Sequence, residues 1–329
     1  MTEKNILLSG VKPTGAPHIG NYFGAMKPMV DLVNSGEYDA YIFIADIHAL
    51  NFVQEKEKMN FLIKNLLLDY LAIGLDPERV VLFQQSEIPE HTELGWFLNT
   101  LVSTPFLMRG HSFKDAKAKN ELDKFSVGDF TYPMLMAADI LLYSPDVVPV
   151  GKDQKQHLEF ARDFAQKFNN KFGETFKLPK PVISEETGTV IGSDGRKMSK
   201  SYGNHLPLFA DETELREYIR RVPMDSKLPE EKKNPDDYNL YKIFKLFATE
   251  EQDQELRKMF QEGWVGYGDI KKYVADVILD YTAEMRARRK ELEAQPEKVL
   301  EIIKAGTEKA KKIAQAKMGE VREKVGFKL

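Results

Sequence analysis

The sequence of 329 residues contains no cysteine. Disulfides, cysteine-ligated zinc, iron–sulfur clusters and thiol nucleophiles are therefore excluded, and the absence suits a reducing cytosol. No apolar run approaches the roughly 20 residues of a membrane-spanning helix, and the start, MTEKNILLSG, carries no secretory signal. We therefore expect a cytoplasmic protein with no membrane partner.

A strong charge of one sign is also missing, because 47 Lys and Arg stand against 51 Asp and Glu, a formal net charge of −4. A nucleic acid must then be met by local patches rather than by the field of the whole protein, and we expect no DNA partner. Residues 281–329 hold a local excess, with 13 Lys and Arg against 8 Asp and Glu. A solvated helix face and an RNA-facing surface explain this excess equally well.

The first 205 residues alternate short apolar runs with helical patterns. Such runs are typical of strands buried on both faces, and their alternation with helices predicts a Rossmann-like, doubly wound parallel sheet of the α/β class. The runs lie at residues 5–11, 41–45, 80–83 and 147–150, and the helical patterns at 18–33, 55–73, 90–101, 131–143 and 153–170. Later patterns are all helical, at 211–221, 238–248, 251–262, 269–293 and 297–325. The sequence thus predicts an α/β domain, residues 1–205, and a mostly helical domain, residues 206–329.

A first motif, residues 17–21 (PHIGN), lies where the first predicted strand leads into the first helix. In an open parallel sheet, phosphates bind at this place because the amides at a helix start and the helix dipole favour anions. Gly20 would let a ligand approach the backbone closely, and His18 can donate to a phosphate or ribose oxygen. Taken alone, a His and a Gly at a helix start are more often capping and packing residues.

A second motif is the basic segment at residues 195–201 (GRKMSKS), preceded by Gly192, Ser193 and Asp194. Two lysines three residues apart in a loop rich in Gly and Ser can close over a polyphosphate. Taken alone, the segment is more typical of an ordinary solvated loop.

Together the two motifs resemble the HIGH and KMSKS signatures of the class I aminoacyl-tRNA synthetases. The first reads His-Ile-Gly-Asn here, and the second matches fully. The resemblance implies attack of an amino-acid carboxylate on the α-phosphorus of ATP, loss of pyrophosphate, and transfer of the aminoacyl group to a tRNA. This chemistry needs positioning and electrostatic stabilisation rather than a covalent enzyme group.

The resemblance also implies roles for individual residues at the nucleotide. We expect Lys197 and Lys200 to bind the β- and γ-phosphates, and His18 and Asn21 to meet the phosphate and ribose region. The residues expected at ATP are Lys12, Thr14, Gly20, Asn21, Gly151, Asp153, Lys197, Met198, Ser199 and Lys200. Mg²⁺ is expected to be held mainly by the nucleotide, since no carboxylate cluster has metal-site spacing. Lys117 is a further phosphate candidate, but the basic loop at 114–119 leaves the register open.

Residues 131–140 (TYPMLMAADI) indicate which amino acid is used. Met136 and Asp139 share one face of the predicted helix, and Tyr132 lies one further turn back. A buried carboxylate needs a partner; the indole N–H of tryptophan supplies one, and Met136 offers its ring a polarizable wall. Phenylalanine would leave the carboxylate unpaired, a penalty that can discriminate by roughly 10⁴–10⁵. The alternative is that Asp139 is a structural or capping residue.

This MxxD pattern resembles the bacterial-type tryptophanyl-tRNA synthetases, whereas tyrosine enzymes typically have Gln in place of Met136. Residues 148–157 (VPVGKDQKQH) resemble the GxDQxxH segment of the same family. The resemblance implies a tryptophan site made of Leu8, Lys12, His48, Tyr132, Met136, Asp139, Val148, Val150 and Gln154, with Tyr132 and Gln154 at the ammonium group.

Several of these positions leave alternatives open. Many relatives carry Gln at position 12, so an active-site role for Lys12 is a hypothesis, and some place Phe where this chain has Leu8. A structural histidine at a strand end explains His48 about as well as a pocket role does. No motif surrounds His91, His111 or His205, which we expect to be surface or structural residues.

The family further implies L-tryptophan and tRNA(Trp) as partners, a homodimer, and anticodon recognition by the helical part. Three other interpretations are weaker. A tyrosyl-tRNA synthetase is disfavoured by Met136, and a nucleotide-transferring enzyme of the same fold usually lacks the KMSKS loop. A non-catalytic RNA-binding paralogue would have no physical need for His18, Lys197, Lys200 and Asp139 together.

Overall fold

The computed structural model describes residues 4–150, 155–183, 189–261 and 264–327. The strands are β1 (Asn5–Val11), β2 (Tyr38–Ile44), β3 (Val80–Gln84), β4 (Val147–Val150) and β5 (Lys180–Ile183). The earlier helices are α1 (Ile19–Asn21), α2 (Lys27–Asn34), α3 (Asp46–Ala49), α4 (Lys56–Ala72), α5 (Glu90–Asn99), α6 (Thr104–Leu107), α7 (His111–Ala118), α8 (Val127–Leu141) and α9 (Lys155–Phe172). The later helices are α10 (Glu212–Arg221), α11 (Asn239–Phe244), α12 (Glu250–Gln261), α13 (Tyr267–Glu293) and α14 (Pro296–Val325).

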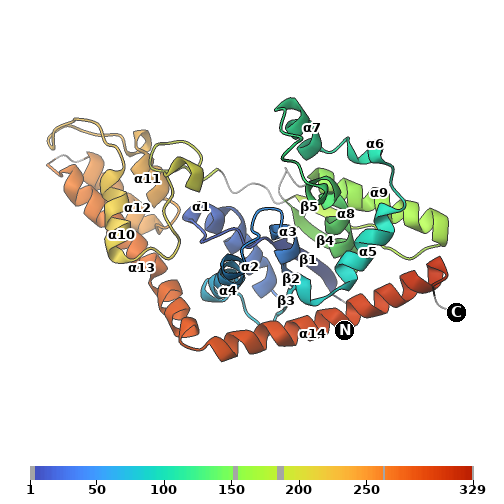
Figure 1. The fold of residues 1–329 in the computed structure, drawn as a ribbon. Coiled ribbons are helices and arrows are strands. Elements are labelled where there is room, and N and C mark those ends of the chain that lie inside the picture. Colours follow the sequence, from blue (N-terminus) through green and yellow to red (C-terminus); the bar gives the residue numbers. More distant parts are fainter. Residues whose placement is uncertain (1–3, 151–154, 184–188, 262–263, 328–329) are drawn as a thin grey trace.

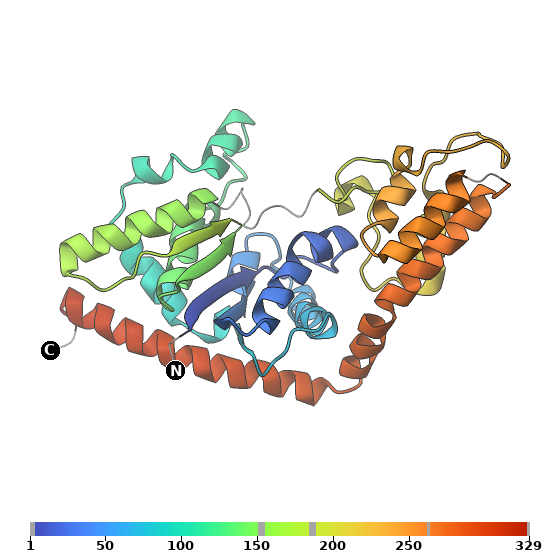
Figure 2. The same cartoon turned by 180° about the vertical axis from the view of Figure 1, so that it is seen from behind.

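The strands of the described chain form one parallel sheet of five, in the order β3-β2-β1-β4-β5 (Figure 2). The predicted doubly wound sheet is therefore confirmed. The chain winds outward through β2 and β3 on one side of β1 and through β4 and β5 on the other, so the strand order reverses between β1 and β4. Ligands bind outside the carboxyl ends of the strands at such a reversal, because the flanking connections diverge there.

Strand β5 is not among the predicted strands. Its sequence, KPVI, begins with a lysine and a proline and offers only two consecutive apolar residues, too few for a periodic signal. The strand forms because its backbone pairs with β4, from Val147 against Lys180 to Val150 against Ile183. Tertiary pairing therefore decides the structure where local sequence does not.

The helix predicted over residues 18–33 is present, but its second turn is widened. Residues Tyr22–Met26 are π-helical, and the Lys27 N–H donates to the Tyr22 carbonyl, five residues back. Pro28 has no N–H to donate to the carbonyl four residues before it, so the regular ladder cannot continue through this point. The widened turn buries Tyr22 and Met26.

Helices α10 to α13 lie to one side of the sheet, and α14 leaves them and runs back along it (Figure 1). Gln84 N–H, at the end of β3, donates to Thr307 Oγ1 at 3.3 Å. Farther along α14, Arg322 Nε donates to Glu93 of α5 at 2.7 Å. The last helix thus packs on the α/β part, and the predicted division at residue 205 stays a prediction. None of the described helices combines the length and the apolar character needed to cross a membrane.

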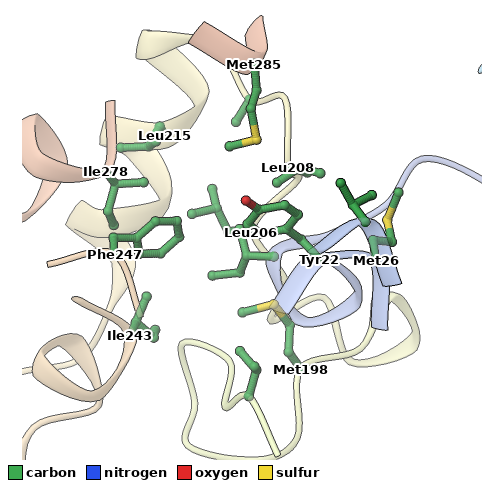
Figure 3. Packing of buried hydrophobic residues seen from close by; sticks show 14 of the residues in the cluster. Tyr22, Met26, Met198, Leu206, Leu208, Leu215, Ile243, Phe247, Ile278 and Met285 are labelled. Atoms are coloured by element: carbon green, nitrogen blue, oxygen red, sulfur yellow. The ribbon is translucent and has the colours of Figure 1, made fainter. Parts of the chain in front are cut away.

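One hydrophobic cluster joins the first helix, the segment after the second motif, and the helical part (Figure 3). The first helix contributes Tyr22 and Met26, the segment after the motif contributes Met198, Leu206 and Leu208, and the helical part contributes Leu215, Ile243, Phe247, Ile278 and Met285. Because burial of apolar surface contributes about 25 cal/mol per Å², this shared core stabilises the position of both motifs.

Replacing Gly306 by alanine is expected to destabilise the protein, because the added Cβ would lie 1.9 Å from the carbonyl oxygen of Leu82. A strand backbone cannot move aside as the end of a side chain can, so we expect a loss of about 1–3 kcal/mol or more in unfolding free energy. Gly319→Ala is a matched control in the same helix, since a Cβ there meets nothing within 4 Å. That control should be neutral or stabilising by about 0.5–1 kcal/mol. Equal melting temperatures for the two variants would contradict the packing of α14 on β3.

Candidate active site

Two adjoining cavities lie at the carboxyl ends of β1 and β4, where the strand order reverses. The smaller has a volume of about 290 Å³ and the larger about 900 Å³. Both are lined by Ser9, Gly10, Lys12 and Pro149. A ligand in one cavity would therefore lie directly beside a ligand in the other.

The smaller cavity gathers most of the residues expected at the amino acid. Those that line it are Leu8, Lys12, His48, Tyr132, Met136, Asp139 and Val148. Gln154 lies outside the described residues, and so does the side chain of Val150, the last residue of β4. The lining residues that the sequence did not indicate are Ser9, Gly10, Phe43, Ala45, Ile140 and Pro149.

Gly10 carried a signal that could have placed it in this cavity. A glycine inside a strand often marks a close approach by another group, and a Cβ on Gly10 would lie 2.3 Å from the Phe43 ring. The missing side chain lets Phe43, from the neighbouring strand β2, lie against β1 and form one wall of the cavity.

Asp139 is buried at the polar end of the smaller cavity, with 1% of its surface exposed. Its Oδ1 accepts from Gln85 Nε2 at 2.7 Å and from His91 Nδ1 at 2.6 Å, and its Oδ2 lies 2.8 Å from His48 Nε2. Burial would raise the pKa of this carboxyl, but the two histidines lower it to about 2, so Asp139 is ionised at neutral pH. Three donors satisfy the buried charge, and one acceptor position on Oδ2 remains for a ligand.

The donors around Asp139 are themselves oriented. Gln85 Oε1 accepts from the Ile47 N–H at 3.1 Å, which turns the amide NH₂ toward Asp139. His48 lines the cavity and donates through Nε2, and its buried Nδ1 has no hydrogen-bond partner among the described residues. This nitrogen is therefore a second acceptor beside the substrate space.

Sequence reasoning missed Gln85 and His91. Gln85 directly follows β3, and the carboxyl ends of neighbouring parallel strands meet at one edge, so its position was an available signal. Of the histidines expected to be surface or structural residues, His111 is exposed, whereas His91 is fully buried against Asp139.

Lys12 lies where the two cavities meet. Its Nζ is 5.3 Å from the centre of the Tyr132 ring and 5.4 Å from that of Phe52. Two aromatic faces of this kind attract an ammonium group. Lys12 thus places a positive charge at the junction, opposite the negative charge of Asp139 in the smaller cavity.

The larger cavity gathers the residues expected at the nucleotide. Those that line it are Lys12, Thr14, His18, Gly20, Asn21, Lys197, Met198, Ser199 and Lys200. Gly151 and Asp153 lie outside the described residues. The π-helical turn and the helices beside it also contribute, through Gly24, Ala25, Met26, Pro28, Met29, Leu66 and Tyr70, none of which the motifs indicated.

His18 both caps α1 and lines the larger cavity. Its Nδ1 accepts from the Asn21 N–H at 3.3 Å, while the Asn21 Oδ1 accepts from the His18 N–H at 3.1 Å. Burial, and then the positive charges of His205 and Lys200, lower the pKa of His18 to about 4. The imidazole is therefore neutral at pH 7, and because Nδ1 is the acceptor, Nε2 carries the hydrogen and can donate to a ligand oxygen.

The second motif is held in place through Asn204. Its Oδ1 accepts from the Ser199 N–H at 2.8 Å, and its Nδ2 donates to the Lys197 carbonyl at 3.2 Å and to Asp194 at 2.7 Å. Asn204 is buried, with 2% of its surface exposed. One amide side chain thus fixes the backbone between the two lysines of the motif.

The segment after Asn204 binds the second motif to the first. The Ile19 N–H donates to the Leu206 carbonyl at 3.0 Å, and the Leu208 N–H donates to the Pro17 carbonyl at 2.9 Å. Lys200 reaches over the first loop, since a Cβ placed on Gly15 would lie 3.0 Å from its Nζ. Burial lowers the pKa of Lys200, and the charge of Asp69 opposes that shift. The two motifs, far apart in sequence, therefore form one surface of the larger cavity.

Neither cavity is lined by Lys117. Residues 114–118 belong to helix α7 rather than to a loop, and α7 buries none of its side chains. Among the described residues, no group of three or more His, Asp or Glu is placed to hold a metal ion. The described residues alone therefore do not form a magnesium site, and we derive no step through Mg²⁺.

Comparison with known proteins gives a consistent family. A family model described as tRNA synthetases class I (W and Y) matches residues 1–281. A tryptophan–tRNA ligase of Fusobacterium nucleatum is 48% identical, over 97% of this chain and 97% of that protein, and one of Rhodopirellula baltica is 45% identical, over 98% and 99%. A crystal structure of the tryptophanyl-tRNA synthetase from Campylobacter jejuni, complexed with ADP and tryptophan, has a TM-score of 0.91 and 42% identity, over 98% of this chain and 99% of that one.

The lowered pKa of His18 predicts a pH-dependent stability. Between pH 6.5 and about 4 the imidazole binds a proton in the unfolded chain but not in the folded protein. The free energy of unfolding should therefore fall as the pH is lowered through this window and level off below it. Asp69, whose pKa burial raises to about 6, acts in the opposite direction, so the measurement is the difference between the unfolding curves of the unaltered protein and of His18→Gln. Parallel curves across the window would contradict the assignment.

Proposed function

The chain belongs to the class I tRNA synthetases for tryptophan and tyrosine, and we propose that its two cavities divide the first reaction of a tryptophan–tRNA ligase between them. The enzyme is an ATP-dependent ligase that activates L-tryptophan to tryptophanyl-adenylate and pyrophosphate and then transfers tryptophan to tRNA(Trp). Tryptophan occupies the smaller cavity, and ATP occupies the larger one. The observation that carries this division is the ionised Asp139 in one cavity and the residues of both signature motifs in the other.

The smaller cavity suits tryptophan in shape and in polarity. Met136 and Val148 form apolar walls, and the free acceptor position on Asp139 Oδ2 receives the indole N–H. An apolar side chain such as that of phenylalanine would leave this buried charge without its fourth partner. Tyr132 and Gln154 are assigned to the ammonium group, as the family resemblance implies.

The larger cavity suits a nucleoside triphosphate. Lys197 and Lys200 supply positive charge for the β- and γ-phosphates, and neutral His18 supplies a donor that requires no counter-charge. The tryptophan carboxylate attacks the α-phosphorus at the junction of the two cavities, where Lys12 stabilises the charge that develops on the phosphate oxygens. The bond from the α-phosphorus to the bridging oxygen breaks, and pyrophosphate leaves. Mg²⁺ arrives bound to the nucleotide.

The remaining assignments follow the family. Residues 1–205 form the catalytic domain, and residues 206–329 form the part that meets the anticodon, with single-stranded bases read on its helices. The enzyme works as a homodimer in the cytoplasm, and Trp96 on α5, 71% exposed, supports an apolar interface there.

The first test is ATP–pyrophosphate exchange with each of the twenty amino acids run separately. Exchange with tryptophan alone is the expected result. Exchange with tyrosine would overturn the assignment of Met136 and Asp139 while leaving the phosphate residues in place. Binding of ATP without exchange for any amino acid would favour a non-catalytic paralogue.

Two substitutions should separate the cavities. Lys200→Ala is expected to lower the activation rate by about 10²–10³ with little effect on tryptophan affinity, because its contact develops in the transition state. Asp139→Ala should instead raise the KM for tryptophan and weaken selectivity, since it removes the indole acceptor. Single-turnover adenylate formation and tryptophan binding measure the two effects. Equal losses of tryptophan affinity in both variants would contradict the division.

A further inference from the structure

The polar network of the smaller cavity continues behind Asp139, away from the substrate space. We propose that His91 and Tyr143 are positioning residues for tryptophan: they hold the Asp139 carboxylate so that one acceptor position faces the indole N–H. This inference rests on the proposed function of Asp139. It adds two residues that line neither cavity and that belong to neither signature motif.

The contacts form a continuous chain across the interior. His91 Nδ1 lies 2.6 Å from Asp139 Oδ1, and His91 Nε2 lies 2.9 Å from the Tyr143 hydroxyl. His91 has 0% and Tyr143 2% of its surface exposed. Three polar side chains from α5, α8 and the end of α8 thus bond to one another where water does not reach them.

The hydrogen bonds fix which ring nitrogen of His91 carries the hydrogen. Burial, and the nearby charges of Asp139 and Glu90, raise the pKa of Tyr143 well above its usual range, so the phenol keeps its hydrogen. The Tyr143 O–H donates to His91 Nε2, which leaves Nδ1 as the N–H that donates to Asp139. A partner on one ring nitrogen sets the tautomer at the other.

The two oxygens of Asp139 are used differently as a result. Oδ1 receives two donors, Gln85 and His91, and so both of its acceptor positions are filled. Oδ2 receives His48, which lines the cavity, and keeps one position open. With Oδ1 held by two donors, the carboxyl group cannot rotate, and the open position keeps one direction.

Packing holds the His91 ring as well. Its centroid lies 6.0 Å from the Phe43 ring, 6.2 Å from Phe83 and 5.6 Å from Tyr143. Phe43 also forms a wall of the smaller cavity. A shift of the imidazole would therefore be felt both by the carboxylate and by the wall against which the indole packs.

Tyr143→Phe tests the outer end of the chain, because it deletes one oxygen and keeps the ring. The KM for tryptophan in pyrophosphate exchange is expected to rise about fivefold, the effect of one buried hydrogen bond. The KM for ATP and the rate at saturating tryptophan should stay within about twofold. An unchanged KM for tryptophan, or an equal rise in both KM values, would overturn the proposal.

A matched pair of substitutions at His91 tests the inner end. Asparagine and leucine have the same branched shape, but only asparagine retains an N–H where His91 Nδ1 donates. Any cavity left by the smaller side chain is common to both, so the comparison isolates the donor. His91→Leu should raise the KM for tryptophan at least about tenfold more than His91→Asn does, in line with a hydrogen bond to a charged group. Equal KM values would overturn the proposal.

The pH profile gives a readout that a merely structural role would not change. With a donor lost, burial should raise the pKa of Asp139 in His91→Leu, so the KM for tryptophan should increase as the pH is lowered from 8 to 5, whereas that of the unsubstituted enzyme stays flat. A flat profile in His91→Leu contradicts the inference. If the unsubstituted enzyme shows no exchange with tryptophan, the proposed function fails and takes this inference with it. Tryptophan exchange with equal effects of the two His91 variants overturns the inference alone.

Discussion

A carboxylate in a protein interior is stable only when donors meet it on several sides, and in this enzyme that requirement falls on Asp139. The donors come from three segments: His48 from α3, Gln85 from the turn after β3, and His91 from α5. Each segment follows a different part of the sheet, so the charge cannot be satisfied unless the ends of β2 and β3 and helix α8 are correctly placed. Recognition of the substrate and packing of the α/β domain therefore depend on the same three hydrogen bonds.

The nucleotide side is organised by backbone hydrogen bonds rather than by a buried charge. The segment after Asn204 pairs with residues 17–19, and the hydrophobic cluster of Figure 3 continues from there into the helical part. Lys197 and Lys200 stay exposed enough to meet a phosphate, while Met198 between them is buried with 3% of its surface exposed. Alternate residues of one short motif thus serve attachment and ligand contact.

Much of this site could be predicted because the motifs fall at the ends of strands, where parallel topology brings them together. Leu8, Met136, Asp139 and Val148 were placed in one pocket by pattern and resemblance, and they share one cavity. Gln85 and His91 could not be found in this way, because their partner lies 54 and 48 residues away and no local pattern marks a side chain that supports another. The return of α14 onto β3 escaped for the same reason: only Gly306, whose Cβ would strike Leu82, records the contact, and an isolated helical glycine has many explanations.

The two cavities carry opposite charge, and this polarity orients the amino acid before any chemistry occurs. Asp139 places a negative charge at the closed end of the smaller cavity, and Lys12 places a positive charge at its junction with the larger one. An indole N–H is favoured at the first end and a carboxylate at the second, so the reversed orientation would bring like charges together in a region of low dielectric. Alignment of the nucleophile with the α-phosphorus then follows from the electrostatics of the empty site, which is the preorganisation that a reaction without covalent catalysis requires.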